Sequence, residues 1–317
     1  MKRLLITVLI ATSLAKPAFA GFDEGLAAAL RGDYAQALKE WKPLAEQGLP
    51  AAQYNLGRMY DYGYGVDQNY ELAVEWYRKA AYQGYTYAQL NLGNRFAYGQ
   101  GVAQDYKQAV AWYRKAADQG DAGAQANLGI MYENGQGVPQ DSKQAAVWYR
   151  KAAEQGHVNA QYYLGTMYAK GEGVPQDAYQ TAEWYRKAAE GGHVGAQFYL
   201  GFMYSTGQGV QQDYQSAAIW YRKAAEQGYP DAQLVLGLLY GLGQGIPRDL
   251  VLAHMLFNLS AATGNEVASK HRETGLKVLT PSQIEEAQAL FSSWKVGTPL
   301  PTTSQTGQQQ NPVHSGK

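Results

Sequence analysis

A unit of 36 residues repeats along the chain without insertion or deletion. The dipeptide Leu-Gly recurs in every unit, at residues 56–57, 92–93, 128–129, 164–165, 200–201 and 236–237. The phrase Trp-Tyr-Arg-Lys-Ala-Ala recurs in the same phase, first at Trp76 and last at Trp220. A fixed period of this length is typical of solenoids, in which each unit buries its apolar face against its neighbours. The repeat therefore favours an extended binding surface over a catalytic pocket.

Each unit is predicted to form two antiparallel helices. The first helix of the first unit runs from about Ala52 to Tyr62, because Ala52, Leu56 and Tyr60 share one face at helical spacing. Gly57 lies in the middle of this helix, where glycine costs about 1 kcal/mol relative to alanine. Its recurrence in every unit predicts a close approach of the partner helix's backbone. A Gly-x-Gly-Val connector follows and permits a tight bend.

The second helix of each unit opens at a short polar residue, which suits the N-cap position. Its buried face is predicted to be the stripe of Trp, Tyr and Ala in the repeated phrase. A glycine follows each second helix, where a left-handed backbone conformation commonly ends a helix. The predicted caps are Asn69, Asp105, Asp141, Asp177, Asp213 and Asp249. The predicted end glycines are Gly48, Gly84, Gly120, Gly156, Gly192, Gly228 and Gly264.

The first twenty residues are typical of a secretory signal peptide. Lys2 and Arg3 give a basic start, residues 4–14 are apolar, and residues 18–20 read Ala-Phe-Ala, a cleavage site of small residues. The apolar run is shorter than the roughly 20 residues that span a bilayer, which argues against a membrane anchor. No other segment is long and apolar enough to cross a membrane. We therefore expect cleavage after Ala20 and a periplasmic or secreted protein.

The net charge indicates which classes of partner to expect, and the cysteine content indicates how the chain is stabilised. The chain has 27 basic and 27 acidic residues, and cleavage removes three basic residues, which leaves a net charge of −3. This weak acidity gives no reason to expect binding to nucleic acid or to an anionic membrane surface. The chain contains no cysteine. An exported chain of this kind depends on packing rather than on disulfides.

The ends of the chain depart from the repeat, as the capping units of a solenoid do. Residues 33–48 form a degenerate second helix, and Thr280-Pro281 is a helix start. Capped ends favour a monomer. The expected organisation is a signal peptide at 1–20, N-terminal capping helices at 21–48, six repeats at 49–264, C-terminal capping helices at 265–295 and a disordered tail at 296–317.

The repeated pattern resembles the Sel-like repeat branch of the tetratricopeptide superfamily. It reads Ala-Gln-x-x-Leu-Gly, then Tyr, then Gly-x-Gly-Val-x-x-Asp, then Ala-x-x-Trp-Tyr-Arg-Lys-Ala-Ala. The resemblance implies an all-α fold, a right-handed α-solenoid of antiparallel helix pairs. It also implies an adaptor or scaffold, with exported bacterial members linked to the cell envelope and to host interaction. Some cysteine-rich exported relatives are penicillin-binding or β-lactamase-like, but this chain lacks their paired cysteines.

No catalytic, cofactor or metal site emerges from the sequence. A Ser-x-x-Lys pattern at Ser292–Lys295 has no Ser-Asp-Asn or Lys-Thr-Gly to complete a β-lactamase site. His157 and His193 occupy equivalent positions in consecutive units, which stacking would place roughly 10 Å apart. That separation is too large for one metal ion with bonds near 2 Å. We interpret both as exposed loop histidines and predict that the protein is not an enzyme.

A partner-binding groove is predicted on the face of the first helices that lies opposite the Leu-Gly-Tyr core stripe, and Asp61 is expected to share that face. The groove should be polar in the early units, where an asparagine ladder can pair with the backbone of an extended peptide. It should be aromatic in the later units, where rings can anchor an apolar segment. Packing of the same rings between adjacent repeats explains them equally well. The candidate residues are Tyr54, Asn55, Arg58, Asn91, Asn94, Asn127, Ile130, Tyr162, Tyr163, Phe198, Tyr199 and Phe202.

The sequence thus predicts a non-catalytic scaffold of the bacterial envelope that binds an unidentified protein or peptide. Two alternatives stay open. One is a module that binds cell-wall fragments or acts like a β-lactamase, and the other is a secreted host-interaction factor.

Overall fold

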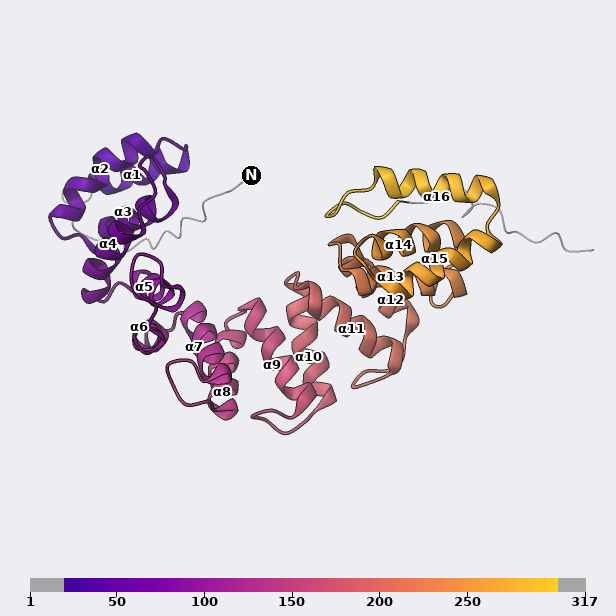
Figure 1. The fold of residues 1–317 in the computed structure, drawn as a ribbon. Helices are drawn as coiled ribbons and strands as arrows, with labels where there is room; N and C mark the ends of the chain where they lie inside the picture. The colour runs from indigo at the N-terminus through magenta and orange to yellow at the C-terminus, as the bar shows by residue number, and fades with distance from the viewer. Residues whose placement is uncertain (1–19, 302–317) are drawn as a thin grey trace, which may run out of the picture. The chain divides into compact units, whose positions relative to one another are not determined.

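The computed structural model describes residues 20–301, and these residues form helices and connecting turns without a β-strand. The fold is an all-α solenoid, as the repeat predicts. It divides into two compact units, residues 1–157 and 158–317. Figure 1 labels the helices. Unit 1 holds α1 (Ala20–Leu30), α2 (Tyr34–Glu46), α3 (Pro50–Tyr62), α4 (Tyr70–Tyr82), α5 (Thr86–Tyr98), α6 (Tyr106–Asp118), α7 (Ala122–Asn134) and α8 (Ser142–Glu154). Unit 2 holds α9 (Val158–Lys170), α10 (Ala178–Glu190), α11 (Val194–Thr206), α12 (Tyr214–Glu226), α13 (Pro230–Leu242), α14 (Leu250–Ala262), α15 (Glu266–Val278) and α16 (Pro281–Ser293).

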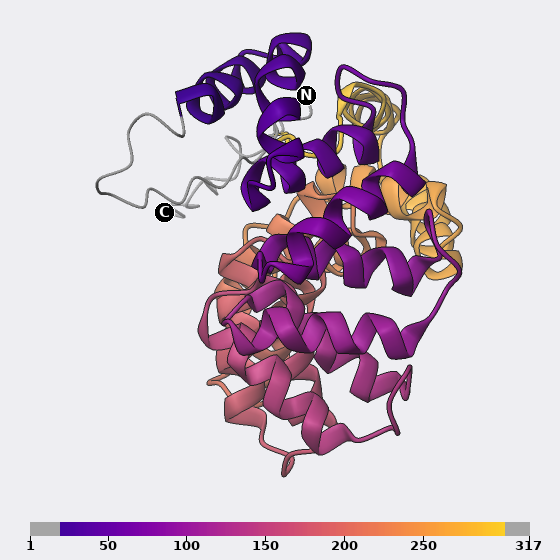
Figure 2. The same ribbon diagram turned by 90° about the vertical axis from the view of Figure 1, so that its left-hand side faces the viewer.

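Each repeat is a helical hairpin, whose first helix we call helix A and whose second we call helix B. Helices A are α3, α5, α7, α9, α11 and α13, and each packs against the helix B that follows it in the chain. Within unit 1, α3 to α8 form successive hairpins that lie side by side (Figure 2). Helix B of one repeat also contacts helix A of the next, as in α4 with α5 and α6 with α7.

The predicted polar caps and end glycines define the helix ends. The side chain of Asp105 accepts hydrogen bonds from the backbone N–H groups of Lys107 and Gln108, which have no partner inside the helix. The same capping is present at Asn69, Asp141, Asp177, Asp213 and Asp249. The glycines that follow the B helices have φ between 84° and 99°, as at Gly84 and Gly120. Thr280 and Gln283 form a complete capping box at the start of α16.

The mid-helix glycines accommodate an aromatic ring of the partner helix. A Cβ atom added to Gly57 would lie 2.7 Å from the ring of Tyr77 on α4, closer than its 3.3 Å to the Ala73 carbonyl oxygen. The predicted close approach of the partner helix's backbone is therefore present at Gly57, but the nearest atoms are those of the Tyr77 ring. The same glycine–ring contact recurs at Gly93 with Tyr113, Gly129 with Tyr149, Gly165 with Tyr185, Gly201 with Tyr221 and Gly237 with Phe257.

Each buried tyrosine hydroxyl of the B helices has one polar partner on its helix A. The partner occupies one of two positions three residues apart, and the position alternates from repeat to repeat. In the sixth repeat the ring is Phe257, and the two positions hold Leu238 and Gly241. The pairs are Tyr77 with Asp61 (3.0 Å), Tyr113 with Asn94 (2.8 Å), Tyr149 with Glu133 (2.5 Å), Tyr185 with Thr166 (3.2 Å) and Tyr221 with Ser205 (3.4 Å).

Buried glutamines join neighbouring repeats. Gln89 on α5 donates to the carbonyl oxygen of Ala81 on α4, and its own side-chain oxygen accepts from Gln119 at the end of α6. One amide thus satisfies groups on two other helices and links a repeat to the one before it. Gln53, Gln125 and Gln197 make the same pair of bonds.

The C-terminal end packs against the last repeat. α15 and α16 both contact α14, and Figure 1 shows α16 beside it. Beyond α16 the backbone N–H of Gly297 donates to the carbonyl oxygen of Glu226, and Leu300 is only 6% exposed. The expected disordered tail therefore does not begin at residue 296, because Leu300 has an apolar site to fill. Residues 302–317 lie outside the described residues.

Within residues 20–301, no helix has the length and apolar character needed to cross a membrane. The predicted signal peptide, apart from Ala20, lies outside the described part of the chain.

Candidate partner-binding surface

The polar groove residues of unit 1 bond mostly to one another. The amide of Asn91 donates to the hydroxyl oxygen of Tyr54 at 3.3 Å. The side-chain oxygen of Asn94 accepts from the amide of Asn127 at 3.2 Å and from the Tyr113 hydroxyl. Of the predicted asparagine ladder of Asn55, Asn91 and Asn127, the last two therefore have amides that are already engaged with neighbouring A helices.

Other unit 1 residues are less available than the sequence suggests. Tyr54 packs against Tyr77 and Tyr85, and burial raises the pKa of its hydroxyl. Ile130 is half-buried against the core of the third repeat. Asp61 is only 2% exposed and does not line a groove. It accepts from the Tyr77 hydroxyl, and one of its oxygens lies 2.7 Å from Arg95, which compensates the buried charge.

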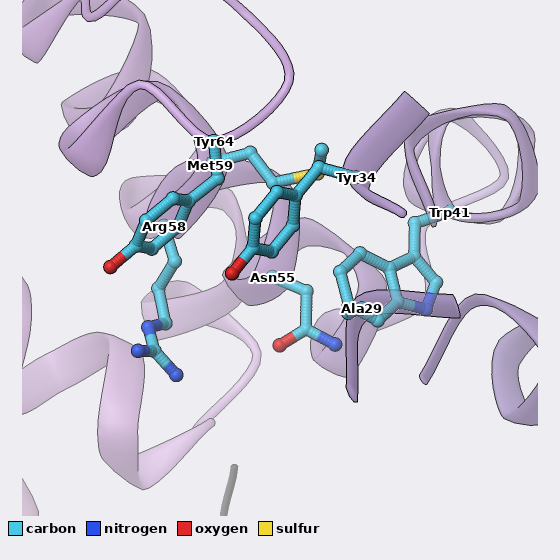
Figure 3. A pocket seen from close by; sticks show the side chains of 7 residues that line it. All are labelled: Ala29, Tyr34, Trp41, Asn55, Arg58, Met59 and Tyr64. Carbon is cyan, nitrogen blue, oxygen red and sulfur yellow. The ribbon is translucent and has the colours of Figure 1, made fainter. Parts of the chain in front are cut away.

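Asn55 and Arg58 face a small recess at the first hairpins of unit 1, which we call the Arg58 recess. Figure 3 shows its side chains. The rings of Tyr34 and Tyr64 stack at 4.8 Å beside it, and the Trp41 indole lies on the other side of Asn55 (Figure 3). The recess has a volume of about 20 Å³, which suits a small terminal group. The lining residues are Ala29, Tyr34, Trp41, Asn55, Arg58, Met59 and Tyr64.

Unit 2 contains a larger hollow of about 470 Å³ between α9, α10 and α11, which we call the aromatic cleft. Three predicted groove residues, Tyr162, Tyr199 and Phe202, line it. Tyr199 is 39% exposed and Phe202 is 42% exposed, so both rings present apolar surface to solvent. The full lining is Tyr162, Thr166, Ala169, Lys170, Gln176, Ala178, Thr181, Tyr185, Tyr199, Phe202, Met203 and Gln208.

Two other predicted residues do not line the aromatic cleft. Phe198 is half-buried and packs against Tyr221 and Tyr229 in the neighbouring core. Tyr163 is half-buried beside Tyr162, with their ring centres 5.7 Å apart. For Phe198, packing against neighbouring elements is therefore the better interpretation.

Stacked rings form the wall of the cleft. Tyr185 lies against Tyr162 at 5.7 Å and against Tyr199 at 5.6 Å, with nearly parallel planes. Burial raises the pKa of the Tyr185 hydroxyl to about 12, so the wall is uncharged at neutral pH. The repeated phrase predicts this tyrosine only as part of the core stripe. Its ring edge reaches the cleft because the small residues Ala169, Ala178 and Thr181 leave space beside it.

His193 supports the same wall and is not an exposed loop histidine. Its Nδ1 accepts the backbone N–H of Ala196 at 3.1 Å and so caps α11. Its ring also stacks on Tyr162 with centres 4.1 Å apart. Burial lowers the pKa of this imidazole. The equivalent His157 is also half-buried, which again differs from the expected exposed loop position.

The described residues offer little for catalysis. They contain no group of three or more His, Cys, Asp or Glu side chains that could hold a metal ion. Ser292 donates its hydroxyl to the carbonyl oxygen of Gln288 in its own helix. This bond is an ordinary helical side-chain contact and gives the serine no activating base.

Comparisons with known proteins agree with this architecture. A sequence model described as the Sel1 repeat matches residues 50–85, 86–121, 122–157, 158–193, 194–229 and 230–265. The crystal structure of a Sel1 repeat protein from Oxalobacter formigenes is 35% identical, covers 76% of this chain and 96% of its own, and superimposes with a TM-score of 0.67. A protective antigen of uropathogenic Escherichia coli with an SLR fold is 30% identical, covers 86% of this chain and 83% of its own, and has a TM-score of 0.51. No curated protein matches this chain.

Proposed function

This chain belongs to the Sel1 repeat family, whose members generally mediate protein–protein interaction and are typically non-catalytic, and we propose that it is an exported scaffold that binds a protein through its A helices. The aromatic cleft of unit 2 is the observation that carries this proposal. A soluble domain that exposes neighbouring apolar rings at a hollow offers a site for an apolar anchor.

The chemistry of the cleft favours an apolar segment of a protein. Tyr199 and Phe202 lie on one face of α11, with the thioether of Met203 beside them. Thr166, Gln176 and Gln208 add polar groups that can orient the backbone of a bound segment. Rigid aromatic side chains lose little conformational entropy on binding, so they are efficient anchors.

Export to the periplasm or the cell exterior is part of the proposal. It rests on the signal-like residues 1–20 and on the relative in uropathogenic E. coli, which is a protective antigen. A role toward a host is compatible with the same location. Fusion of residues 1–20 to a reporter that is active only after export tests this part separately.

Site-specific photocrosslinking in cells tests the binding site. A photoreactive residue at position 199 should give a discrete protein adduct, identified by mass spectrometry. The matched control places the same residue at position 98, because Tyr98 is 71% exposed and is not among the residues that line the aromatic cleft. Equal labelling from both positions, or no adduct from position 199, would contradict the proposal.

A second experiment separates binding from folding. Phe202→Ala should weaken binding of the captured protein at least about tenfold, because exposed aromatic anchors dominate interface energy. Its Tm should change little, since the Phe202 ring is 42% exposed. A glycan adduct from position 199 would instead support the cell-wall alternative, in which the rings stack on sugars.

A further inference from the structure

Arg58 differs from the other cations of the A helices. Arg95 lies 2.7 Å from the Asp61 carboxylate, and Lys170 lies 3.7 Å from Glu172. Arg58 has neither an ion pair nor a hydrogen bond within the described part of the chain, and its guanidinium lies 5.8 Å from the ring centre of Tyr54 and 5.7 Å from that of Tyr62. Arg95 makes the direct ion pair with Asp61, and Arg58 acts on that carboxylate only at longer range, so its guanidinium has no anion in direct contact.

The remaining polar groups of the Arg58 recess are also uncommitted. The amide of Asn55 and the hydroxyls of Tyr34 and Tyr64 make no hydrogen bond to another described residue, although their side chains line one hollow (Figure 3). The equivalent amides of the next two repeats, Asn91 and Asn127, do bond to neighbouring helices. The first repeat therefore differs from the next two in that its half-buried Asn55 amide has no hydrogen-bond partner among the described residues.

We propose that the Arg58 recess binds a carboxylate group of a protein partner. A guanidinium matches a planar carboxylate through two parallel hydrogen bonds, and the Asn55 amide and tyrosine hydroxyls supply further donors. The hollow of about 20 Å³ has room for a group the size of a carboxylate oxygen. Apolar walls from Trp41 and Met59 reduce competition from water, which strengthens a charge-assisted bond.

The site can be tested with acetate alone, apart from any partner. In side-chain NMR spectra of the purified protein, the Arg58 Nε–H and Asn55 amide signals should shift saturably with acetate but not with neutral acetamide. Arg58→Gln should weaken the response at Asn55 at least about tenfold, and Arg58→Lys should weaken it less, because lysine keeps the charge but loses the planar fork. Arg78→Gln is the matched control, since it removes an exposed positive charge on α4.

The outcomes separate this inference from the proposed function. A linear, unsaturable shift, an equal response to acetamide, or unchanged saturation in Arg58→Gln would overturn the carboxylate site whatever happens at the aromatic cleft. Unperturbed backbone signals in Arg58→Gln would show that the variant is folded. N-acetylglycine presents a chain-terminal carboxylate, and N-acetylaspartate N-methylamide presents a side-chain one. Tighter binding of one of these two compounds identifies whether the recess prefers a chain-terminal or a side-chain carboxylate. If neither compound competes with acetate, a protein carboxylate is not the ligand.

Discussion

At the residue scale, the repeat is a set of matched pairs between helix A and helix B. Each mid-helix glycine of helix A contacts an aromatic ring of helix B. Each tyrosine hydroxyl among these rings bonds to a polar side chain at one of two positions on helix A. The alternation of that partner cannot be predicted from one repeat, because the two positions lie one helical turn apart and both reach the ring edge. Comparison of the five copies that carry the tyrosine reveals it.

Alanine substitution within α13 tests the glycine–ring contact. A Cβ at Gly237 would lie 2.7 Å from the Phe257 ring, whereas at Gly241 the nearest atom is 3.9 Å away. Gly237→Ala should lower the free energy of unfolding by about 1–3 kcal/mol through overpacking. Gly241→Ala should raise it by up to about 1 kcal/mol through helix propensity. Urea unfolding measures both, and destabilisation of equal size would disprove a specific ring contact.

A double-mutant cycle tests the hydroxyl pairing in the sixth repeat. Phe257→Tyr should cost about 1–3 kcal/mol, because Leu238 and Gly241 offer its hydroxyl no side-chain acceptor. Gly241→Ser places a hydroxyl where Ser205 contacts Tyr221 in the previous repeat. The double variant should therefore recover about 1 kcal/mol relative to the sum of the single changes. Strict additivity of the two changes in thermal unfolding would refute the pairing.

At the element scale, the helix ends show which local sequence patterns predict the structure. The aspartate caps and end glycines are predictable because each acts within its own turn of the chain. His193 is a cap that the sequence analysis missed, since imidazole is an uncommon acceptor at this position. A signal was present, because the equivalent residue two repeats earlier in unit 1, Asp121, caps α7 in the same way.

Acid should weaken α11 through His193. Its Nδ1 accepts the Ala196 N–H only when the imidazole is neutral, and burial lowers its pKa in the folded protein below the ordinary 6.5. The unfolded chain therefore binds the proton more tightly, so this stability is full above pH 6.5 and is lost as pH falls through the lower folded pKa. His193→Asn, which keeps an acceptor, should reduce the pH dependence of urea midpoints between pH 7 and 5. An unchanged pH dependence would contradict this role.

The candidate surface was only partly predictable from helical periodicity. Periodicity correctly placed Tyr162, Tyr199 and Phe202 near one another, because neighbouring A helices present equivalent positions on the same side. It could not show that Phe198 belongs to the core, since burial there depends on Tyr229 in the following turn. It also misplaced Asp61, whose burial depends on an ion pair with Arg95 one repeat away.

At the scale of the whole molecule, stability depends on interfaces between successive repeats. In such an array each interface between neighbouring repeats contributes separately to the free energy of unfolding. An interface that lacks one contact therefore lowers stability locally. The glutamine link is incomplete at the last repeat. Gln233 donates to the Ala225 carbonyl oxygen, but its own side-chain oxygen is buried without a partner. The residue that would donate to it is Thr263, where the first, second, third and fifth copies carry Gln83, Gln119, Gln155 and Gln227.

Completing this link should stabilise the C-terminal repeat. Thr263→Gln supplies an amide at the position from which Gln227 reaches Gln197 at 2.7 Å, so it should satisfy the buried oxygen of Gln233 and raise the free energy of unfolding by about 1 kcal/mol. Thr263→Ala is the control, because it removes only the hydroxyl bond to the Ser260 carbonyl oxygen. Hydrogen exchange should locate the gain in α13 and α14, since a nearest-neighbour array confines it there. Protection that rises equally in α3 and α4 would mean that the molecule unfolds as one block and that its repeats are not independent.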